Sequence, residues 1–230
     1  YGVMRGLVAL GLFQSQDEIN RSPKQTYGEV RPGDIRYKDV NADGKIDDDD
    51  VVPIAHSNVP QIQYGFALEY RYKRWTISAL FTGAAKVNFL YGGSGFYPFS
   101  GGEVGNILSI VNDPKNRWTP AWYSGDPSTE NPNARFPRLT YGENKNNNRA
   151  STFWLADGSY LRWKSLDISY RIGTNKALRT VGISDMNLQF VGQNLAVWDS
   201  VKLWDPGQAS KNGAVYPLQR TFSLQLTATF

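Results

Sequence analysis

The chain has 230 residues, of which 40% are hydrophobic and 13% aromatic, and it contains two Met and no Cys. Its length allows one or two domains, and the lack of Cys excludes a disulfide scaffold and a thiolate metal site. The formal net charge is +4, but the 25 Lys and Arg residues are scattered and form no stripe that would bind nucleic acid. No apolar stretch approaches the 18 residues of a helical membrane span, whereas a β-barrel needs none because its two faces alternate.

The first residues, YGVMRGLVALGLF, lie within a strand-like pattern, and we expect a strand between residues 2 and 13. No initiator Met or signal peptide precedes this pattern. We therefore expect the sequence to be a section of a longer protein.

An acidic segment, DVNADGKIDDDD at residues 39–50, has the spacing of a calcium-binding loop. Such a loop places oxygen ligands at positions 1, 3, 5, 7, 9 and 12, with a Gly at position 6 for the sharp turn. The matching ligands are Asp39, Asn41, Asp43, the carbonyl of Lys45, Asp47 and Asp50, and Gly44 stands at the turn. Asp50 replaces the Glu of an EF-hand, as in dockerin-type loops. We expect a structural Ca²⁺ or other divalent cation here, and the alternative is a solvated acidic turn.

Two alternating segments, residues 61–72 and 75–85, predict an antiparallel hairpin because only Lys73 and Arg74 separate them. Their apolar sides comprise Tyr64, Phe66, Leu68, Tyr70 and Tyr72 in the first segment and Trp75, Ile77, Ala79 and Phe81 in the second. Aromatic rings therefore gather at the turn. Such rings suit a membrane interface or the ordinary packing of a hairpin end.

The long stretch 86–152 lacks strand periodicity and carries aromatic residues that are candidates for ligand contact. Exposed rings in a loop stack on sugar rings or pack against a partner protein, and the alternative is that the loop packs on itself. These candidates are Tyr97, Phe99, Trp118, Trp122 and Tyr123.

Three further strands are predicted at residues 160–172, 186–198 and 221–230. In the first of them Leu161 and Trp163 fall out of phase with the later apolar residues, which predicts a β-bulge. The last places Phe222, Leu224, Leu226, Ala228 and Phe230 on one side and Thr, Ser and Gln on the other. Ten residues tilted by roughly 45° cross the hydrocarbon core of a bilayer, but the same pattern suits a strand of a soluble sandwich.

Catalysis is not expected from this chain. His56 is the single histidine and follows the acidic loop, so we expect a loop histidine here and not a histidine-based triad or zinc site, and no serine has a neighbouring base in a recognisable pattern. The acidic loop also lacks an activated nucleophile, so that a metal there would brace the loop without performing chemistry.

The connections differ in length on the two sides of the predicted sheet. The turns at 73–74 and 173–184 are short, whereas the stretches at about 14–60, 86–152 and 199–218 are long and rich in Gly, Pro, Asn and Asp. Short turns on one side and long loops on the other are typical of outer-membrane barrels.

Four segments together resemble the C-terminal part of TonB-dependent transporters of the SusC/RagA type. They are PGDIRYKDVNADGKIDDDD from Pro32, YGFALEYRYKRWTISALFTGA from Tyr64, NRWTP (Asn116–Pro120) with ENPNARFPRL (Glu130–Leu139), and DGSYLRWKSLDISYRI from Asp157. The chain departs from the family pattern where AWYSGDPST separates the tryptophan motif from ENPNA, and where WDPGQ (Trp204–Gln208) replaces a GxDPE-like stretch.

This resemblance implies an all-β fold, an antiparallel transmembrane β-barrel in which the chain supplies about the last six strands of a 22-stranded plugged barrel. The plug domain would lie outside this chain. The family further implies import of a glycan or peptide across the outer membrane of a Gram-negative, Bacteroidota-like bacterium. Its partners would be a SusD-like surface lipoprotein acting as a lid, TonB through the missing N-terminal part, the rest of the barrel and membrane lipid.

A second hypothesis remains open, in which the chain is a soluble calcium-dependent β-sandwich that binds carbohydrate. The two hypotheses differ in what covers the apolar side of the last strand. In a barrel Phe222, Leu224 and Leu226 face lipid, whereas in a sandwich they meet a second sheet.

Overall fold

The computed structural model describes residues 2–100 and 105–230. Residues 101–104 of the expected 86–152 loop lie outside the described part. The chain divides into two compact units. The first, here called the loop unit, comprises residues up to Val59 together with Asn88–Ala156 and Ala209–Val215, and the second, the strand unit, comprises Pro60–Val87, Asp157–Gln208 and Tyr216–Phe230. Within the described residues, no helix has the length and apolar character needed to cross a membrane.

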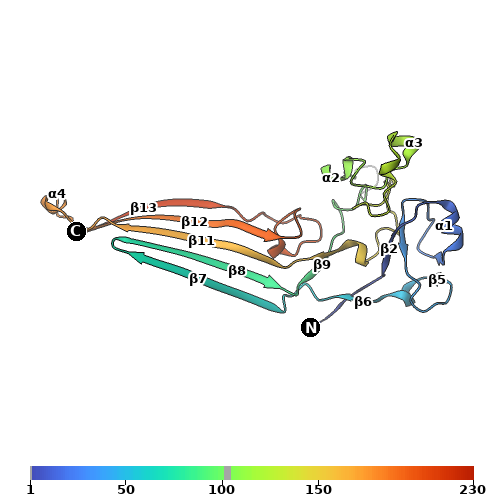
Figure 1. Cartoon of the computed structure of the whole chain (residues 1–230), viewed down its shortest axis with the longest axis horizontal. Coiled ribbons are helices and arrows are strands. Elements are labelled where there is room, and N and C mark those ends of the chain that lie inside the picture. Colours follow the sequence, from blue (N-terminus) through green and yellow to red (C-terminus); the bar gives the residue numbers. More distant parts are fainter. Residues whose placement is uncertain (1, 101–104) are drawn as a thin grey trace. The chain divides into compact units, whose positions relative to one another are not determined.

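The strand unit is built on one antiparallel sheet of five strands in the order β13-β12-β11-β8-β7 (Figure 1). The strands are β7 (Ile62–Tyr72), β8 (Trp75–Ala85), β11 (Tyr160–Arg171), β12 (Asp185–Asp199) and β13 (Thr221–Thr229). Two residues join β7 to β8, and a connection with the short helix α4 (Lys176–Thr180) joins β11 to β12. These five strands and both short turns confirm the predictions from alternation.

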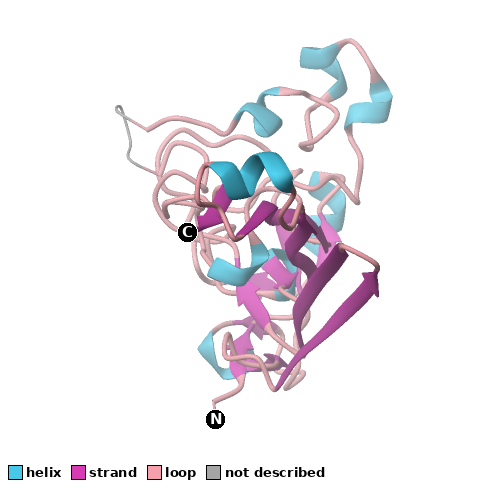
Figure 2. Ribbon diagram, turned by 90° about the vertical axis from the view of Figure 1, so that its left-hand side faces the viewer, coloured by secondary structure: helices cyan, strands magenta, loops and turns pink. Residues whose placement is uncertain are grey.

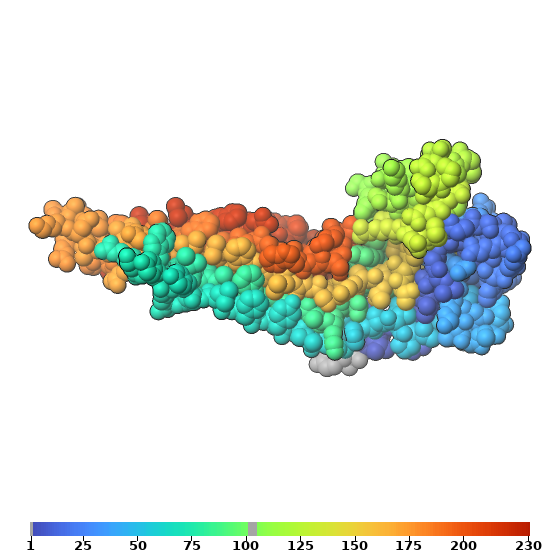
Figure 3. Space-filling model, viewed as in Figure 1, coloured from blue at the N-terminus to red at the C-terminus, as the bar shows by residue number. Residues whose placement is uncertain are grey.

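The register of the sheet carries the apolar pattern from strand to strand. Tyr70 pairs with Ile77, Ile77 with Ile168, Ile168 with Phe190 and Phe190 with Leu224. The adjacent row of paired residues is polar and lies on the opposite face of the sheet. It consists of Arg71, Thr76, Ser169, Gln189 and Gln225. A sheet of period two therefore has one apolar and one polar face. In Figure 3 the strands appear as successive bands, from the green-blue β7–β8 hairpin to the red β13.

The predicted bulge is present in β11, where the pairing with both neighbouring strands shifts between Trp163 and Ser165. The extra residue, Lys164, brings Trp163 back onto the apolar face. There its ring stacks on Phe81 at a centroid distance of 5.8 Å, and Phe81 stacks on Phe66 at 5.0 Å. The bulge therefore keeps the apolar face continuous through a change of phase in the sequence.

The loop unit consists of short strands and helices joined by long loops (Figure 2). Its two-stranded sheets pair β1 (Met4–Gly6) with β6 (Val52–Ala55), β2 (Ala9–Leu12) with β4 (Ile35–Tyr37), β3 (Lys24–Gln25) with β5 (Lys45–Ile46), and β9 (Asn88–Leu90) with β10 (Leu155–Asp157). The helices are α1 (Gln16–Arg21), α2 (Ser109–Asn112) and α3 (Ala121–Ser124), with 3₁₀ turns at Asp48–Asp50, Pro127–Thr129 and Thr152–Trp154; a further 3₁₀ turn, Pro206–Gln208, belongs to the strand unit.

An aromatic core holds the loop unit together. Phe96 lies at its centre, stacked on Tyr91 at 5.0 Å and edge-to-face with Trp154 at 5.6 Å, and Phe136 contacts both Phe96 and Trp154. Phe96 and Phe136 are 1% exposed. Aromatic pairs in this geometry add about 0.5–1.5 kcal/mol each to the gain from burial, so these long connections fold as a structured layer.

Residues 2–13 form strands, as expected, but these strands do not add a sixth strand to the five-stranded sheet. This segment forms two short strands, β1 and β2, which pair with β6 and β4 and not with the five-stranded sheet. Gly11 has a φ of 111°, and the register of β2 against β4 shifts between Ala9 and Gly11 before the pairing continues to Leu12. Leu7, Leu12 and Phe13 are instead buried in the core of the loop unit. The described wall is therefore five strands wide.

Candidate functional site

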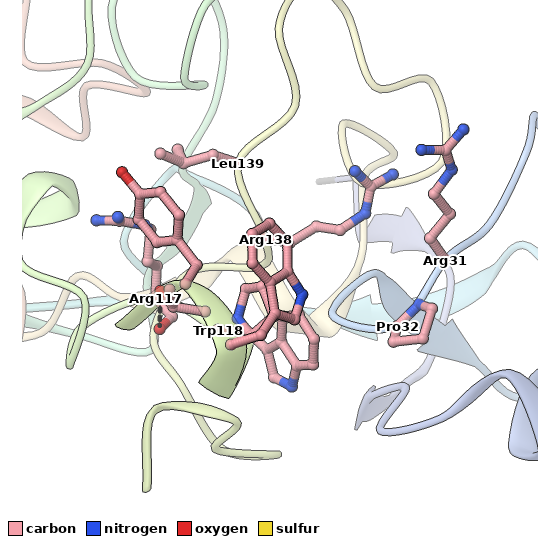
Figure 4. A pocket seen from close by; sticks show the side chains of 10 residues that line it. Arg31, Pro32, Arg117, Trp118, Arg138 and Leu139 are labelled. Atoms are coloured by element: carbon pink, nitrogen blue, oxygen red, sulfur yellow. Dashed lines mark hydrogen bonds between the residues drawn. The ribbon is translucent and has the colours of Figure 1, made fainter. Parts of the chain in front are cut away.

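A cavity of about 450 Å³ in the loop unit brings together three of the five predicted aromatic residues, Trp118, Trp122 and Tyr123 (Figure 4). The remaining lining residues are Arg31, Pro32, Arg117, Thr119, Pro120, Arg138 and Leu139. In the view of Figure 4, the guanidinium groups of Arg31 and Arg138 lie on one side of the cavity and that of Arg117 on the other.

Trp118 is a buried part of this cavity, with only 5% of its surface exposed. It packs against Gly33, whose φ of 90° and close approach both require glycine. A Cβ at position 33 would lie 2.7 Å from Cδ2 of Trp118 and 2.8 Å from Cβ of Arg138. The indole Nε1 donates a hydrogen bond to the side-chain oxygen of Gln14 at 3.3 Å, so the ring is held in a defined orientation.

Trp122 and Tyr123 are the accessible aromatic residues of the site, 84% and 67% exposed. Both lie on α3, which begins after Pro120 and ends at Gly125 in the left-handed conformation. The backbone N–H of Ala121 at the start of this helix donates to Glu130 at 2.7 Å. A short, capped turn therefore presents two large rings to a binding partner or ligand.

The three arginines of the cavity are already paired within the chain. Arg117 is buried and donates from Nη1 to the carbonyls of Val111 and Asn112, both at 2.7 Å. Exposed Arg31 pairs with Glu29 at 2.9 Å. Each guanidinium has a partner within the chain, and the arginines add their apolar stems to the cavity wall. The arrangement suits an apolar or aromatic group better than an anion.

The fully buried carboxylate of Asp34 holds the guanidinium of Arg138 in place. Its Nη2 donates to Asp34 at 3.0 Å, and its Nε forms an ion-pair contact at 2.9 Å. The side-chain amides of Asn144 and Asn147 donate to the same carboxylate at 3.1 and 2.8 Å, and the backbone N–H of Arg31 donates at 2.8 Å. This Asp34 network links residues 31–34 to residues 138–147, and thus positions one wall of the cavity.

The other two predicted aromatic residues lie elsewhere in the loop unit. Tyr97 packs edge-to-face on Phe96 and Trp154 in the aromatic core, and burial raises the pKa of its hydroxyl to about 12. Phe99 packs with Tyr141 at 5.7 Å. Neither residue lines the cavity of Trp118.

In the acidic loop, the predicted metal ligands make hydrogen bonds within the loop itself. Asp39 accepts from the N–H groups of Ala42 and Gly44 at 2.7 and 2.8 Å, and Asn41 accepts from Asp43 at 3.0 Å. Asp50 is buried and accepts from the N–H groups of Val40 and Asp47. Among the described residues, no group of three or more His, Cys, Asp or Glu side chains is arranged to hold a metal ion.

The side chain of Lys45 lies among these carboxylates. Its ammonium is 2.5 Å from Asp47 and 3.5 Å from Asp43. Its hydrogen bond to Asp47 lowers the pKa of that carboxyl, and the N–H of Lys45 does the same for Asp43. The ammonium of Lys45 therefore lies beside two of the expected metal ligands, Asp43 and Asp47.

Residues 31, 32, 117, 138 and 139 line the cavity, although the sequence did not single them out as site residues. Residues 32, 117, 138 and 139 fall within segments that the sequence did single out, PGDI, NRWTP and ARFPRL, and Arg31 directly precedes the first of them. The signal was present as motifs, but only the folded chain shows that three distant motifs surround one space.

The fold is that of part of a β-barrel wall with a structured layer of long connections, and the comparisons with known proteins agree. No protein-family model matches the chain. TonB-dependent receptor P26 of Formosa agariphila is 28% identical over 240 residues, covering 99% of this chain and 22% of the receptor. TonB-dependent receptor P3 of the same organism is 24% identical, covering 88% of the chain and 20% of the receptor.

Among solved structures, the RagAB peptide importer in the open-open state matches 99% of this chain and 22% of its own, with a TM-score of 0.66 at 18% identity. Its closed-closed state gives a TM-score of 0.65 at 18% identity, over 99% of this chain and 23% of its own. The resemblance to SusC/RagA-type TonB-dependent transporters, expected from the motifs, is confirmed. The chain spans about a fifth of the length of the curated relatives it matches.

Proposed function

We propose that this chain forms part of the wall and outer-loop layer of a TonB-dependent importer in the outer membrane of a Gram-negative, Bacteroidota-like bacterium. The observation that carries the proposal is the apolar face that runs across all five strands. Phe222, Leu224 and Leu226 on β13 are 61%, 71% and 61% exposed, and no second sheet covers them within the described strand unit. In water such a face would be a large exposed apolar patch, whereas lipid satisfies it.

Both edges of the sheet support the proposal. Strands β7 and β13 each pair on one side only, and every residue of β7 is exposed. An unpaired strand edge in hydrocarbon is costly because its N–H and C=O groups have no partners. The rest of a larger barrel would pair with both strands. A soluble sandwich, the alternative hypothesis, would require a second sheet facing the first, and the described residues of the strand unit form a single sheet.

Depth labelling of the full-length protein in bilayers tests this proposal. Leu224→Cys and Gln225→Cys are neighbouring variants at nearly equal depth on opposite faces, and this chain has no native Cys. A nitroxide at position 224 should collide mainly with dissolved oxygen, and one at 225 with a water-soluble nickel chelate. Equal access of the nickel chelate to both positions would contradict the barrel.

The proposed ligand is a glycan or a peptide, captured together with a SusD-like surface lipoprotein and imported with energy from TonB. Support for a peptide comes from the solved importer that shares this fold, which is described as a peptide importer. Trp122 and Tyr123 are the proposed contacts, because they are exposed beside an apolar cavity. Trp118, Tyr97 and Phe99 would support the loop layer from within.

The double variant Trp122→Ala with Tyr123→Ala tests this contact. Tyr141→Ala serves as its control, since Tyr141 is 66% exposed in the same unit and does not line the cavity. Loss of lipoprotein co-purification or of ligand uptake in the double variant alone is the expected result. Normal partner binding and uptake in both variants would rule out this contact.

A structural Ca²⁺ at the acidic loop is a separate proposal, supported by the ligand spacing from Asp39 to Asp50. The ion would have to displace the ammonium of Lys45 and share carboxylates with backbone N–H groups. Ca²⁺ at 100 times its dissociation constant should stabilise the loop unit by about 2.7 kcal/mol. Thermal unfolding with Ca²⁺, with Mg²⁺ and with chelator measures this, and Asp39→Asn should abolish the shift. Identical curves would leave the acidic turn metal-free.

A further inference from the structure

A buried ion pair joins the connection after β12 to the strand β11. Arg162 of β11 donates from Nη2 to both carboxylate oxygens of Asp205, each at 2.6 Å, and the two side chains are only 7% and 13% exposed. By contrast, Arg171 and Asp185 at the other end of β11 and β12 form a pair whose side chains are 70% and 36% exposed. Asp205 belongs to WDPGQ, a motif to which the proposed function assigns no role.

Arg162 extends from the polar face of the sheet, near the end that carries the long connections. The ring of its neighbour Trp163 stacks on Phe81 on the apolar face, so the side chain of Arg162 lies on the opposite face. Arg162 pairs in register with Val197 of β12, which shares that face. Asp205 therefore reaches back over the polar face, beside the last residues of β12.

Residues 200–208, here called the strap, are also tied down at both ends. The hydroxyl of Ser200 donates to the carbonyl of Asp157 at 3.0 Å, and the side-chain amide of Gln208 donates to the carbonyl of Tyr216 at 2.5 Å. Both acceptors belong to the strand unit. The strap thus leaves β12, crosses to β11 and returns beside the chain that enters β13.

The middle of the strap lies directly on β11. The N–H of Gly207 donates to Asp205 at 2.9 Å, and a Cβ on Gly207 would lie 3.3 Å from the hydroxyl of Tyr160. Pro206 between them is buried, and its ring fixes the backbone angle φ. Layers that stack on a sheet lie about 10 Å from it. The strap therefore takes up space above the polar face, at the end of the sheet with the long connections.

In the proposed barrel, the polar face lines the lumen and the long connections lie at the extracellular end. We propose that the strap narrows the outer end of the lumen and selects ligands by their width, and that the pair of Arg162 and Asp205 holds it in place. This inference rests on the proposed barrel function. Removal of one partner of a buried pair leaves an uncompensated charge, so loss of either residue should release the strap. Both are positioning residues, because they act on a ligand only through the strap.

Thiol labelling of the full-length protein in the outer membrane of intact cells tests the strap, with any Cys outside this chain replaced. Val197→Cys is the reporter, because Val197 lies on the polar face in register with Arg162 and this chain has no native Cys. The probes are N-ethylmaleimide and fluorescein maleimide, which share one reactive group and differ in width. In the native background only the narrow reagent should react quickly.

Asp205→Ala should raise the rate of the wide reagent by at least about a hundredfold, because loss of a buried pair shifts the closed strap toward the open form by that factor or more. Arg162→Met breaks the same pair from the other side and should have the same effect, so the test holds even if one variant fails to assemble. The matched control is Arg171→Met, which removes the same group from the exposed pair on the same strand and face. It should label like the native protein, since exposed pairs contribute little.

Equal rates of the two reagents in the native background would show that the strap excludes nothing. Unchanged rates in both Asp205→Ala and Arg162→Met would show that the pair does not hold the strap, and an equal acceleration of both reagents would indicate general loosening without selection by width. Each of these results overturns the proposal. If they occur while a nitroxide at position 224 contacts lipid, the strap alone is rejected, whereas free access of the nickel chelate to position 224 would reject the barrel.

Discussion

Replacement of Asp34 by Ala is expected to open the loop unit around the cavity. Asp34 is fully buried, and its carboxylate accepts hydrogen bonds from the backbone of Arg31 and from the side chains of Arg138, Asn144 and Asn147. Its removal leaves the mostly buried guanidinium of Arg138 and the buried amide of Asn147 without this acceptor, whereas the half-buried amide of Asn144 keeps a hydrogen bond to Thr140. Breaking a buried charge pair by deleting one partner costs about 3–5 kcal/mol.

Hydrogen–deuterium exchange of the full-length protein measures this loss locally. The backbone N–H of Ile35 donates to Asn147, and that of Tyr37 donates to Gln25, so both amides report on the network. A loss of 3–5 kcal/mol corresponds to exchange that is faster by about two to three and a half powers of ten. Asp34→Asn keeps the shape and one acceptor oxygen, and should give a smaller increase.

The matched control is Glu29→Ala, which also removes one carboxylate but from an exposed pair with Arg31. Surface pairs contribute little, so its exchange should stay close to that of the native chain. Equal protection of Ile35 and Tyr37 in the native chain and in Asp34→Ala would refute the view that this carboxylate organises the cavity wall.

Three other substitutions test separate parts of the reasoning. Gly33→Ala should destabilise the loop unit by about 2 kcal/mol or more, measured by hydrogen–deuterium exchange. Gly125 also has a positive φ, 73°, but a Cβ there would meet open space, so Gly125→Ala should cost less. Equal losses in the two variants would contradict the role of the Trp118 contact. Leu224→Arg should destabilise the membrane-inserted protein by about 2–4 kcal/mol if the residue lies near the bilayer midplane, while Gln225→Arg should be tolerated. Heat-modifiable gel mobility measures how much of each variant assembles in the membrane. Equal assembly of the two variants would contradict the assignment of faces. Burial raises the pKa of Tyr97 from 10.0 to about 12, so its stabilisation is complete below pH 10 and is lost as the pH rises to about 12. Denaturant unfolding between pH 9 and 12 should show that the free energy of unfolding falls less in Tyr97→Phe than in the native chain. Identical pH profiles of the two proteins would show that Tyr97 does not cause this loss of stability.

The sequence alone was sufficient to predict the five strands of the sheet, because a strand and its two faces are specified by neighbouring residues. Alternation over residues 61–72 and 221–230 specifies which side chains share a face, and Lys73–Arg74 specifies the connection. The bulge at Lys164 was readable from the phase change near Trp163. The four motifs were likewise sufficient to predict the relationship to TonB-dependent transporters, which the comparisons confirmed.

The tertiary structure decided what depends on distant partners. Residues 2–13 have strand-forming side chains, but whether they pair with the edge strand β7 or with β4 and β6 depends on where Leu7 and Phe13 are buried. The cavity joins Pro32, Trp118 and Leu139, and no local pattern predicts that these three segments meet around the buried Asp34. Nor does the spacing of the acidic loop reveal that the Lys45 ammonium lies beside Asp47. Local periodicity determines a strand and its two faces, whereas burial and long-range hydrogen bonds decide which segments become neighbours.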